Sequence, residues 1–195
     1  MKQTTMKKLF KSAALMMSTF LTLSVMASNP GEPKPVKSSS VSWTASKVTG
    51  THSGIITLGQ SHLEMEGERV VGGRIEVDMS TIVVTDLEGE YKTKLEDHLK
   101  TDEFFGVAQY PTASLDITGS TTNDDGSQQV TGNITIKGVT QPISFTMSFK
   151  GNYATAALNI DRTKFGIRYG SGSFFDDLGD KAINDEFQLR AKLEL

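Results

Sequence analysis

Apolar and polar residues alternate with a period of two along most of the chain. The clearest stretch is residues 143–149, ISFTMSF, in which every second residue is apolar and Ser or Thr stands between. Such alternation predicts an antiparallel strand with one buried face. The Gly and Pro of residues 138–142, GVTQP, predict a chain reversal, so residues 130–149 are expected to form a β-hairpin. The same period predicts further antiparallel strands at 75–79, 113–117, 156–160 and 187–195.

Strands that each carry one apolar face must bury those faces together. This happens when two sheets stack or when one sheet closes into a barrel. Gly72 and Gly73 interrupt the run from Arg69 to Met79. Paired glycines inside a strand indicate a bulge or a sharp bend, which is the feature that lets a sheet curl into a barrel.

One helix is predicted, through residues 90–100, EYKTKLEDHLK. Thr85 and Glu88 have the spacing of a capping box, and Tyr91, Leu95 and Leu99 then recur at helical spacing. A single short helix in an all-β chain usually covers an open end of the sheet. The aromatic pair at 104–105 follows it and is expected to close one mouth.

The N-terminus predicts export. Four lysines, the last at Lys11, precede an apolar run from Ala13 to Met26, and a small residue, Ala27, ends it. This is the pattern of a cleaved signal peptide, here residues 1–27. The run is about 14 residues long, short of the ~20 that span a bilayer. We therefore expect a periplasmic or secreted protein without a stable membrane span.

Residues 28–40, SNPGEPKPVKSSS, hold three of the five prolines and show no apolar period. This composition predicts a flexible linker. The predicted organisation is a signal peptide at 1–27, a linker at 28–40 and one domain at 41–195.

Charge and cysteine content exclude several classes of function. Without residues 1–27 the chain has 16 basic and 23 acidic residues, a net charge near −7. Such a surface repels phosphate backbones, so nucleic acid is not an expected partner. The chain has no cysteine, which excludes disulfides, thiolate catalysis and cysteine zinc sites.

The candidate catalytic groups do not form a recognisable motif. The histidines at 52, 62 and 98 lie on different predicted elements and lack paired metal-ligand spacing. Ser53 and His52, with Asp97 beside His98, resemble the components of a hydrolase triad, but no nucleophile-elbow motif is present. The acids at 176, 177, 180 and 185 lack the alternation of an EF-hand loop. No catalytic residue and no metal site are therefore predicted.

Three segments together resemble the YceI-like family of secreted bacterial lipid- and polyisoprenoid-binding proteins. They occur in the family's order and spacing: DHLK at 97–100 leading through the aromatic pair 104–105 to YPT at 110–112, VTGNITIKGVTQP at 130–142, and IDRTKFGI at 160–167. The likeness extends over residues 41–195.

The resemblance implies an all-β fold, an eight-stranded antiparallel lipocalin-like barrel with one short helix. It also implies a binding protein, not an enzyme, that transports or stores an amphiphilic lipid in an apolar tunnel. The expected ligand is a polyisoprenoid, an isoprenoid quinone or a fatty chain, and no other cofactor is expected. Two other functions are left open, a secreted hydrolase using His52 or His98 and a ligand-free module with a solid core. The oligomeric state is also left open, with a homodimer as one possibility.

The inward faces of the predicted strands supply candidate ligand contacts. An eight-stranded barrel is either filled by its side chains or holds a ligand, and periodicity does not distinguish the two. The large uncharged residues expected to line a tunnel are Trp43, Ile56, Leu58, Ile75, Val77, Phe104, Phe105, Leu115, Ile134, Ile136, Phe145, Met147, Phe149 and Leu158.

Overall fold

The computed structural model describes residues 31–37 and 40–195, so the signal peptide predicted at 1–27 lies outside the described residues. The described chain forms ten strands, one α-helix and two short 3₁₀ helices. Their bounds are β1 Glu32–Pro35, β2 Ser40–Lys47, β3 Gly50–Leu58, β4 His62–Glu66, β5 Arg69–Val84, α1 Gly89–Lys100, β6 Thr112–Thr122, β7 Gln128–Ile136, β8 Val139–Lys150, β9 Tyr153–Asp161, η1 Arg162–Phe165, η2 Gly179–Lys181 and β10 Ile183–Glu194.

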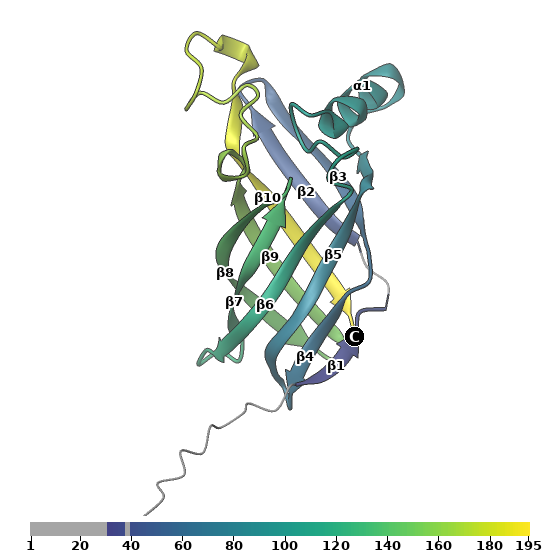
Figure 1. The fold of residues 1–195 in the computed structure, drawn as a ribbon, viewed down its shortest axis with the longest axis vertical. Coiled ribbons are helices and arrows are strands. Elements are labelled where there is room, and N and C mark those ends of the chain that lie inside the picture. The colour runs from purple at the N-terminus through teal and green to yellow at the C-terminus, as the bar shows by residue number, and fades with distance from the viewer. Residues whose placement is uncertain (1–30, 38–39) are drawn as a thin grey trace, which may run out of the picture.

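Eight of these strands close into an antiparallel barrel (Figure 1). Hydrogen-bonded neighbours follow the order β5-β3-β2-β10-β9-β8-β7-β6, and β6 pairs with β5 to complete the ring. The two remaining strands extend one end, since β4 pairs with the first part of β5 and β1 pairs with β4. The predicted eight-stranded barrel with one helix is confirmed.

The period of two sets the inside and the outside of the barrel. Phe145 and Met147 of β8 are 6% and 2% exposed, whereas Ser144 and Thr146 between them face outward. The predicted hairpin of β7 and β8 is present, but its turn is shorter than expected. The turn is formed by Lys137 and Gly138, both at positive φ, and β8 already begins at Val139.

The glycine pair in β5 forms the predicted bulge. The register of β4 and β5 shifts between the pairs Glu64↔Gly72 and Met65↔Val70. Gly73 has a φ of +126°, and a Cβ there would lie 2.5 Å from the carbonyl oxygen of His62. Only glycine combines this backbone conformation with so close an approach of the neighbouring strand.

The described residues 31–37 do not form the flexible linker predicted over residues 28–40. Residues Glu32–Pro35 are strand β1, and the backbone N–H of Val36 donates to the carbonyl oxygen of Ser61 at 2.9 Å. Lys37 is similarly bound to Glu194, at the end of β10. The sequence did not predict this strand because proline lacks the N–H that a strand in the middle of a sheet needs. At a sheet edge, however, proline is tolerated.

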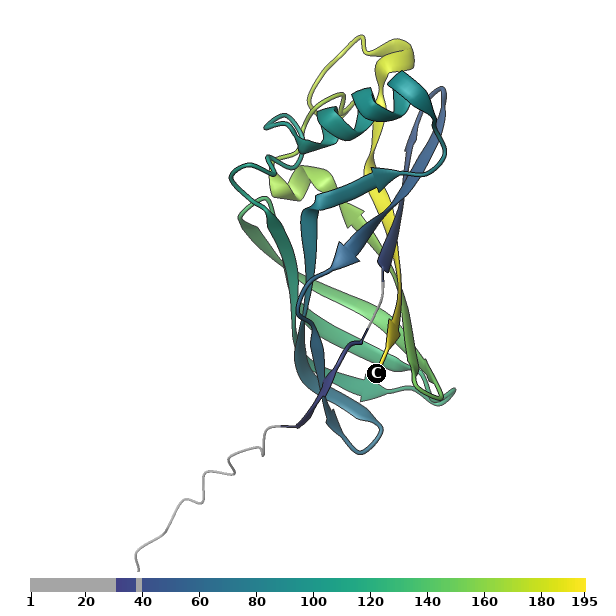
Figure 2. The same ribbon diagram turned by 90° about the vertical axis from the view of Figure 1, so that its right-hand side faces the viewer.

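Helix α1 lies across one end of the barrel (Figure 2). Leu99 is buried and Leu95 packs against the core, but Tyr91 is 77% exposed. The apolar stripe of the helix is therefore shorter than the sequence predicted. Among the described residues, no helix is long and apolar enough to cross a membrane.

The predicted capping box is absent. Glu88 is the N-cap residue of α1, and its side chain makes no capping hydrogen bond. The hydroxyl of Thr85 instead donates to the carbonyl oxygen of Ser53, at 3.2 Å. That bond ties the start of the helical segment to β3, so a tertiary contact replaces the local one.

A buried amide joins the β4–β5 turn to β7. Gln128 is 4% exposed, and its Oε1 accepts hydrogen bonds from the Val70 N–H and the Ser120 hydroxyl, both at 2.9 Å. Its Nε2 donates to the carbonyl oxygen of Glu68 at 2.7 Å. One side chain thus satisfies two backbone groups that would otherwise be buried without partners.

Replacing Gln128 by Leu is expected to lower the free energy of unfolding by about 2–5 kcal/mol, because the Val70 N–H and the Glu68 carbonyl lose their partner. Urea denaturation followed by circular dichroism measures this loss. Gln129→Leu is the matched control, since Gln129 bonds Ser144 at an exposed position. Equal losses in the two variants would contradict a specific role for the buried amide.

Candidate ligand-binding cavity

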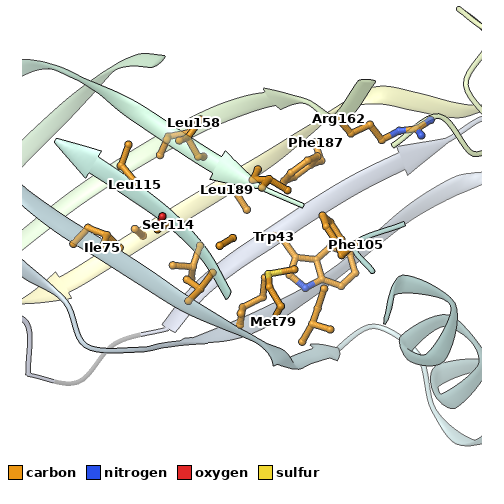
Figure 3. Close-up of a pocket in the computed structure, with 18 of the residues that line it drawn as sticks. Trp43, Ile75, Met79, Phe105, Ser114, Leu115, Leu158, Arg162, Phe187 and Leu189 are labelled. Carbon is orange, nitrogen blue, oxygen red and sulfur yellow. The ribbon is translucent and has the colours of Figure 1, made fainter. Parts of the chain in front are cut away.

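The inward faces of the barrel strands surround a cavity of about 150 Å³ (Figure 3). Thirty residues line it, and all but four are apolar: the exceptions are Ser114, Thr155, Arg162 and Asn184. Arg162 is the only charged residue in this wall. Apolar cavities stay dry and accept apolar guests. The chemistry of the wall therefore suits a hydrocarbon.

Twelve of the fourteen residues predicted to line a tunnel do line the cavity: Trp43, Ile56, Ile75, Val77, Phe104, Phe105, Leu115, Ile134, Ile136, Phe145, Met147 and Leu158. The other two, Leu58 and Phe149, pack against the core but are not part of the wall. Both lie near the ends of their strands, β3 and β8.

The prediction missed much of the wall on the β9–β10 side. Phe187, Leu189, Ala191 and Leu193 of β10 all line the cavity, as does Ala156 of β9. The alternation of 187–195 carried the signal for these positions. Because only large side chains were selected as candidates, the alanines were omitted. Their small side chains leave room for a guest that a larger residue would fill.

Trp43 of β2 is packed against the backbone of β3. It is 6% exposed, and a Cβ added at Gly54 would lie 2.6 Å from its Cε2 and Cζ2 atoms. Gly54 thus provides the space in which the indole lies. Within the described part of the chain, Trp43 Nε1 has no hydrogen-bond partner, although it is buried. Leaving such a donor unpaired costs about 1–3 kcal/mol.

Aromatic side chains gather where α1 meets the barrel. Phe104 and Phe105 both line the cavity, and their ring centroids are 6.3 Å apart. Phe105 also contacts Phe187 of β10 edge-on, at 6.4 Å. His98 packs edge-on against Phe104 at 5.0 Å and against Tyr169 at 4.6 Å. The helix is thereby joined to the loop after β9 by aromatic rings packed edge-on, and the rings of Phe104 and Phe105 line this part of the cavity.

Arg162 stands at the start of η1 and is 4% exposed. Its five N–H donors have five acceptors: the backbone oxygens of Asn184, Ile167, Tyr169 and Ile183 at 2.8–3.0 Å, and Oδ1 of Asp185 at 3.4 Å. Burial lowers the pKa of this guanidinium, while Asp185 and Asp161 raise it. The side chain therefore fixes residues 167–185 to the barrel. A lone Arg in a sequence does not signal such burial, so this residue was not predicted.

Asp185 completes the Arg162 cluster. The hydroxyl of Ser173 donates to its Oδ2 at 2.6 Å. Burial alone would raise the pKa of Asp185, but hydrogen bonds from Ser171 and Ser173 and the charge of Arg162 together lower it. Asp185 thus acts as an ionised anchor for the loop. Among the described residues, no group of three or more His, Asp or Glu side chains is placed to hold a metal ion.

The histidines do not form the triad considered from the sequence. His52 Nδ1 lies 2.9 Å from Asp86 Oδ2, and the Ser53 N–H donates to Asp86 Oδ1 at 2.8 Å. The carboxylate partner of His52 is thus Asp86, not Asp97. Within the described residues no hydroxyl is bonded to the other nitrogen of His52. His98 Nε2 lies 3.8 Å from a Glu103 carboxylate oxygen.

The fold and its site define a lipocalin-like barrel with an apolar internal cavity. The profile of the YceI-like domain matches residues 34–195. The chain belongs to the YceI-like family.

Two curated relatives are similar to part of the chain. A UPF0312 protein of Pseudomonas putida is 29% identical over 107 residues, covering 49% of this chain and 53% of the relative, and one of Azotobacter vinelandii is 28% identical over 78 residues, covering 40% and 38%. The match thus spans about half or less of these curated relatives.

Two solved structures share the fold at low sequence identity. BcnA of Burkholderia cenocepacia superposes with a TM-score of 0.61 at 20% identity, covering 80% of this chain and 94% of its own. A polyisoprenoid-binding domain from Saccharophagus degradans, implicated in plant cell wall breakdown, gives 0.58 at 12% identity, covering 82% and 95%.

Replacing Asp185 by Asn is expected to destabilise the protein by about 1–2 kcal/mol at neutral pH, because a charge-assisted partner of Arg162 and Ser173 is lost. A carboxylate whose pKa is lowered by folding stabilises the protein above its unfolded pKa of about 3.9, and this contribution is lost as the pH falls through the folded value. The stability difference between wild type and variant, measured by urea denaturation at several pH values, should therefore shrink below about pH 4. A difference that stays constant or grows in acid would contradict the account.

Proposed function

We propose that this protein binds a long-chain amphiphilic lipid, a polyisoprenoid or an isoprenoid quinone, inside the barrel, and carries or stores it. The observation that supports this most directly is the internal cavity, whose thirty-residue wall has 26 apolar members. The description of the Saccharophagus degradans neighbour as polyisoprenoid-binding points in the same direction.

The apolar wall supplies enough free energy for useful affinity. Burying roughly 400 Å² of apolar ligand surface at ~25 cal/mol per Å² contributes about 10 kcal/mol. Loss of ligand freedom on association offsets a large part of it, so dissociation constants in the micromolar to nanomolar range are expected. Each added prenyl unit increases the buried area, and chain length therefore dominates the affinity.

The cavity must enlarge to admit a long chain. A volume of about 150 Å³ holds only a short part of one. Met79 and Met147 are flexible, unbranched side chains in the wall that can change rotamer at little cost. Ligand entry therefore requires rearrangement of such side chains rather than opening of the hydrogen-bonded barrel.

The surroundings of His52 favour a structural role for this residue over hydrolysis. His52 orients no hydroxyl nucleophile among the described residues, and its contact with Asp86 fixes the segment between β5 and α1 against β3. The hydrolase alternative therefore has no assembled catalytic group at this histidine.

A substitution in the wall tests the proposed site. Ala156 of β9 lines the cavity, whereas the next residue, Ala157, is exposed on the outer face. Ala156→Phe should weaken binding of a prenyl lipid by at least about tenfold, because the ring occupies the space of the guest, which corresponds to about 1.4 kcal/mol. Ala157→Phe is the matched control and should bind as the wild type does.

The measurement is a titration of both variants and the wild type with prenyl compounds of increasing length, after circular dichroism has verified folding. Affinity should rise with each prenyl unit in the wild type. The proposal fails if wild-type affinity is indifferent to length, or if both variants bind alike.

We further propose that the lipid is carried outside the cytoplasm, as the N-terminal pattern indicates. Mass spectrometry of the protein recovered from the periplasm or the medium should find a chain cleaved near Ala27. Recovery of the mature protein with Met1 still attached would contradict export by signal cleavage.

A further inference from the structure

The wall of the cavity contains one fully buried side-chain hydrogen-bond donor that has no partner among the described residues. Among the described residues, two buried side-chain nitrogen or oxygen atoms lack a partner, Trp43 Nε1 and His98 Nε2. His98 is not part of the wall, and Glu103 lies 3.8 Å from its nitrogen. Trp43 belongs to the wall and is 94% buried. Buried N–H groups nearly always have an acceptor, so this one needs an explanation.

The indole is held in place before any ligand arrives. Its ring lies on the bare backbone of Gly54, and Met79 and Phe105 lie beside it (Figure 3). A donor on a fixed ring loses little freedom when it forms a hydrogen bond. The nitrogen is buried, and Met79 beside the ring is flexible enough to move aside for a ligand.

The wall offers no free positive charge. Its only charged residue, Arg162, has all five donors engaged by the protein. A phosphate placed in the cavity would therefore lose water without gaining a counter-charge, which is strongly unfavourable. A neutral group that only accepts hydrogen bonds meets no such penalty.

We propose that Trp43 Nε1–H donates a hydrogen bond to a neutral acceptor oxygen on the head of the bound lipid, such as the carbonyl of a prenylated quinone ring. This inference rests on the proposed lipid-binding function and names the head-group chemistry of the same site. The head lies near Trp43, Met79 and Phe105. The tail extends toward Ile75 and Leu115, which lie at the other end of the cavity (Figure 3).

Three ligands with the same prenyl tail test this proposal: a benzoquinone, the plain hydrocarbon and the prenyl phosphate. The wild type should bind the quinone about 3- to 10-fold more tightly than the hydrocarbon, which is the usual contribution of one hydrogen bond. The phosphate should bind more weakly than both. In Trp43→Phe, which keeps an aromatic ring but no N–H, the ratio of quinone affinity to hydrocarbon affinity should fall to about one, whatever the change in hydrocarbon affinity itself.

A spectroscopic readout in the wild type makes the test independent of that variant. Trp43 is the only tryptophan of the chain, so the indole N–H of ¹⁵N-labelled protein gives a single cross-peak. Saturation with the quinone should move this peak in the direction of a hydrogen-bonded indole, and saturation with the hydrocarbon should not.

The outcomes separate the two proposals. If the lipids bind but the quinone preference survives in Trp43→Phe, or the peak responds equally to quinone and hydrocarbon, the role of Trp43 is overturned and lipid binding stands. If Trp43→Phe does not fold, the cross-peak of the wild type decides. If none of the three ligands binds the wild type, the proposed function itself is wrong, and the inference falls with it.

Discussion

Closure of one antiparallel sheet is the constraint on which the rest of the structure depends. When β6 pairs with β5, every second side chain of eight strands is turned into one shared interior. Residues such as Phe145 and Met147 must then be apolar because water is excluded from that space. The same closure leaves the ring without open strand edges along most of its circumference, and the prolines of β1 protect the edge that remains.

An apolar barrel interior must be covered at the ends of the barrel. At the α1 end, the chain covers the cavity with aromatic rings and with a loop fastened by one buried cation. Arg162 can be buried beside an apolar cavity because four carbonyl oxygens and Asp185 together accept a hydrogen bond from each of its five N–H groups. A buried charge is tolerated only when its hydrogen bonds are complete. All the hydrogen-bond donors of Arg162 are engaged in holding the loop, so the cavity is left without a free charged group.

The features that local periodicity controls could be predicted from the sequence. Alternation placed Phe145, Met147 and Leu158 inside, and the glycine pair at 72–73 marked the bulge between β4 and β5. The contact of Thr85 and the strand β1 could not be predicted, since Thr85 bonds to Ser53 of β3 instead of capping α1, and β1 forms by pairing with β4.

The site was predictable only in part for the same reason. Strand alternation identifies which face is inward but not where along the barrel the space lies, so Leu58 and Phe149 were included. Ala156 was omitted because only large side chains were chosen. The partners of Arg162 come from residues 167–185, and the seat of the Trp43 ring is Gly54 on the adjacent strand. Such long-range contacts leave no local signal in a single sequence.

The central claim is that the interior of this barrel is a lipid-binding site and not a solid core. Native mass spectrometry of the protein, purified without detergent, tests it most directly. The account predicts a one-to-one complex with added mass in the range of a prenyl lipid, lost after extraction with organic solvent and regained on incubation with a prenylated quinone. A protein found only at its bare polypeptide mass, before and after that incubation, would contradict it.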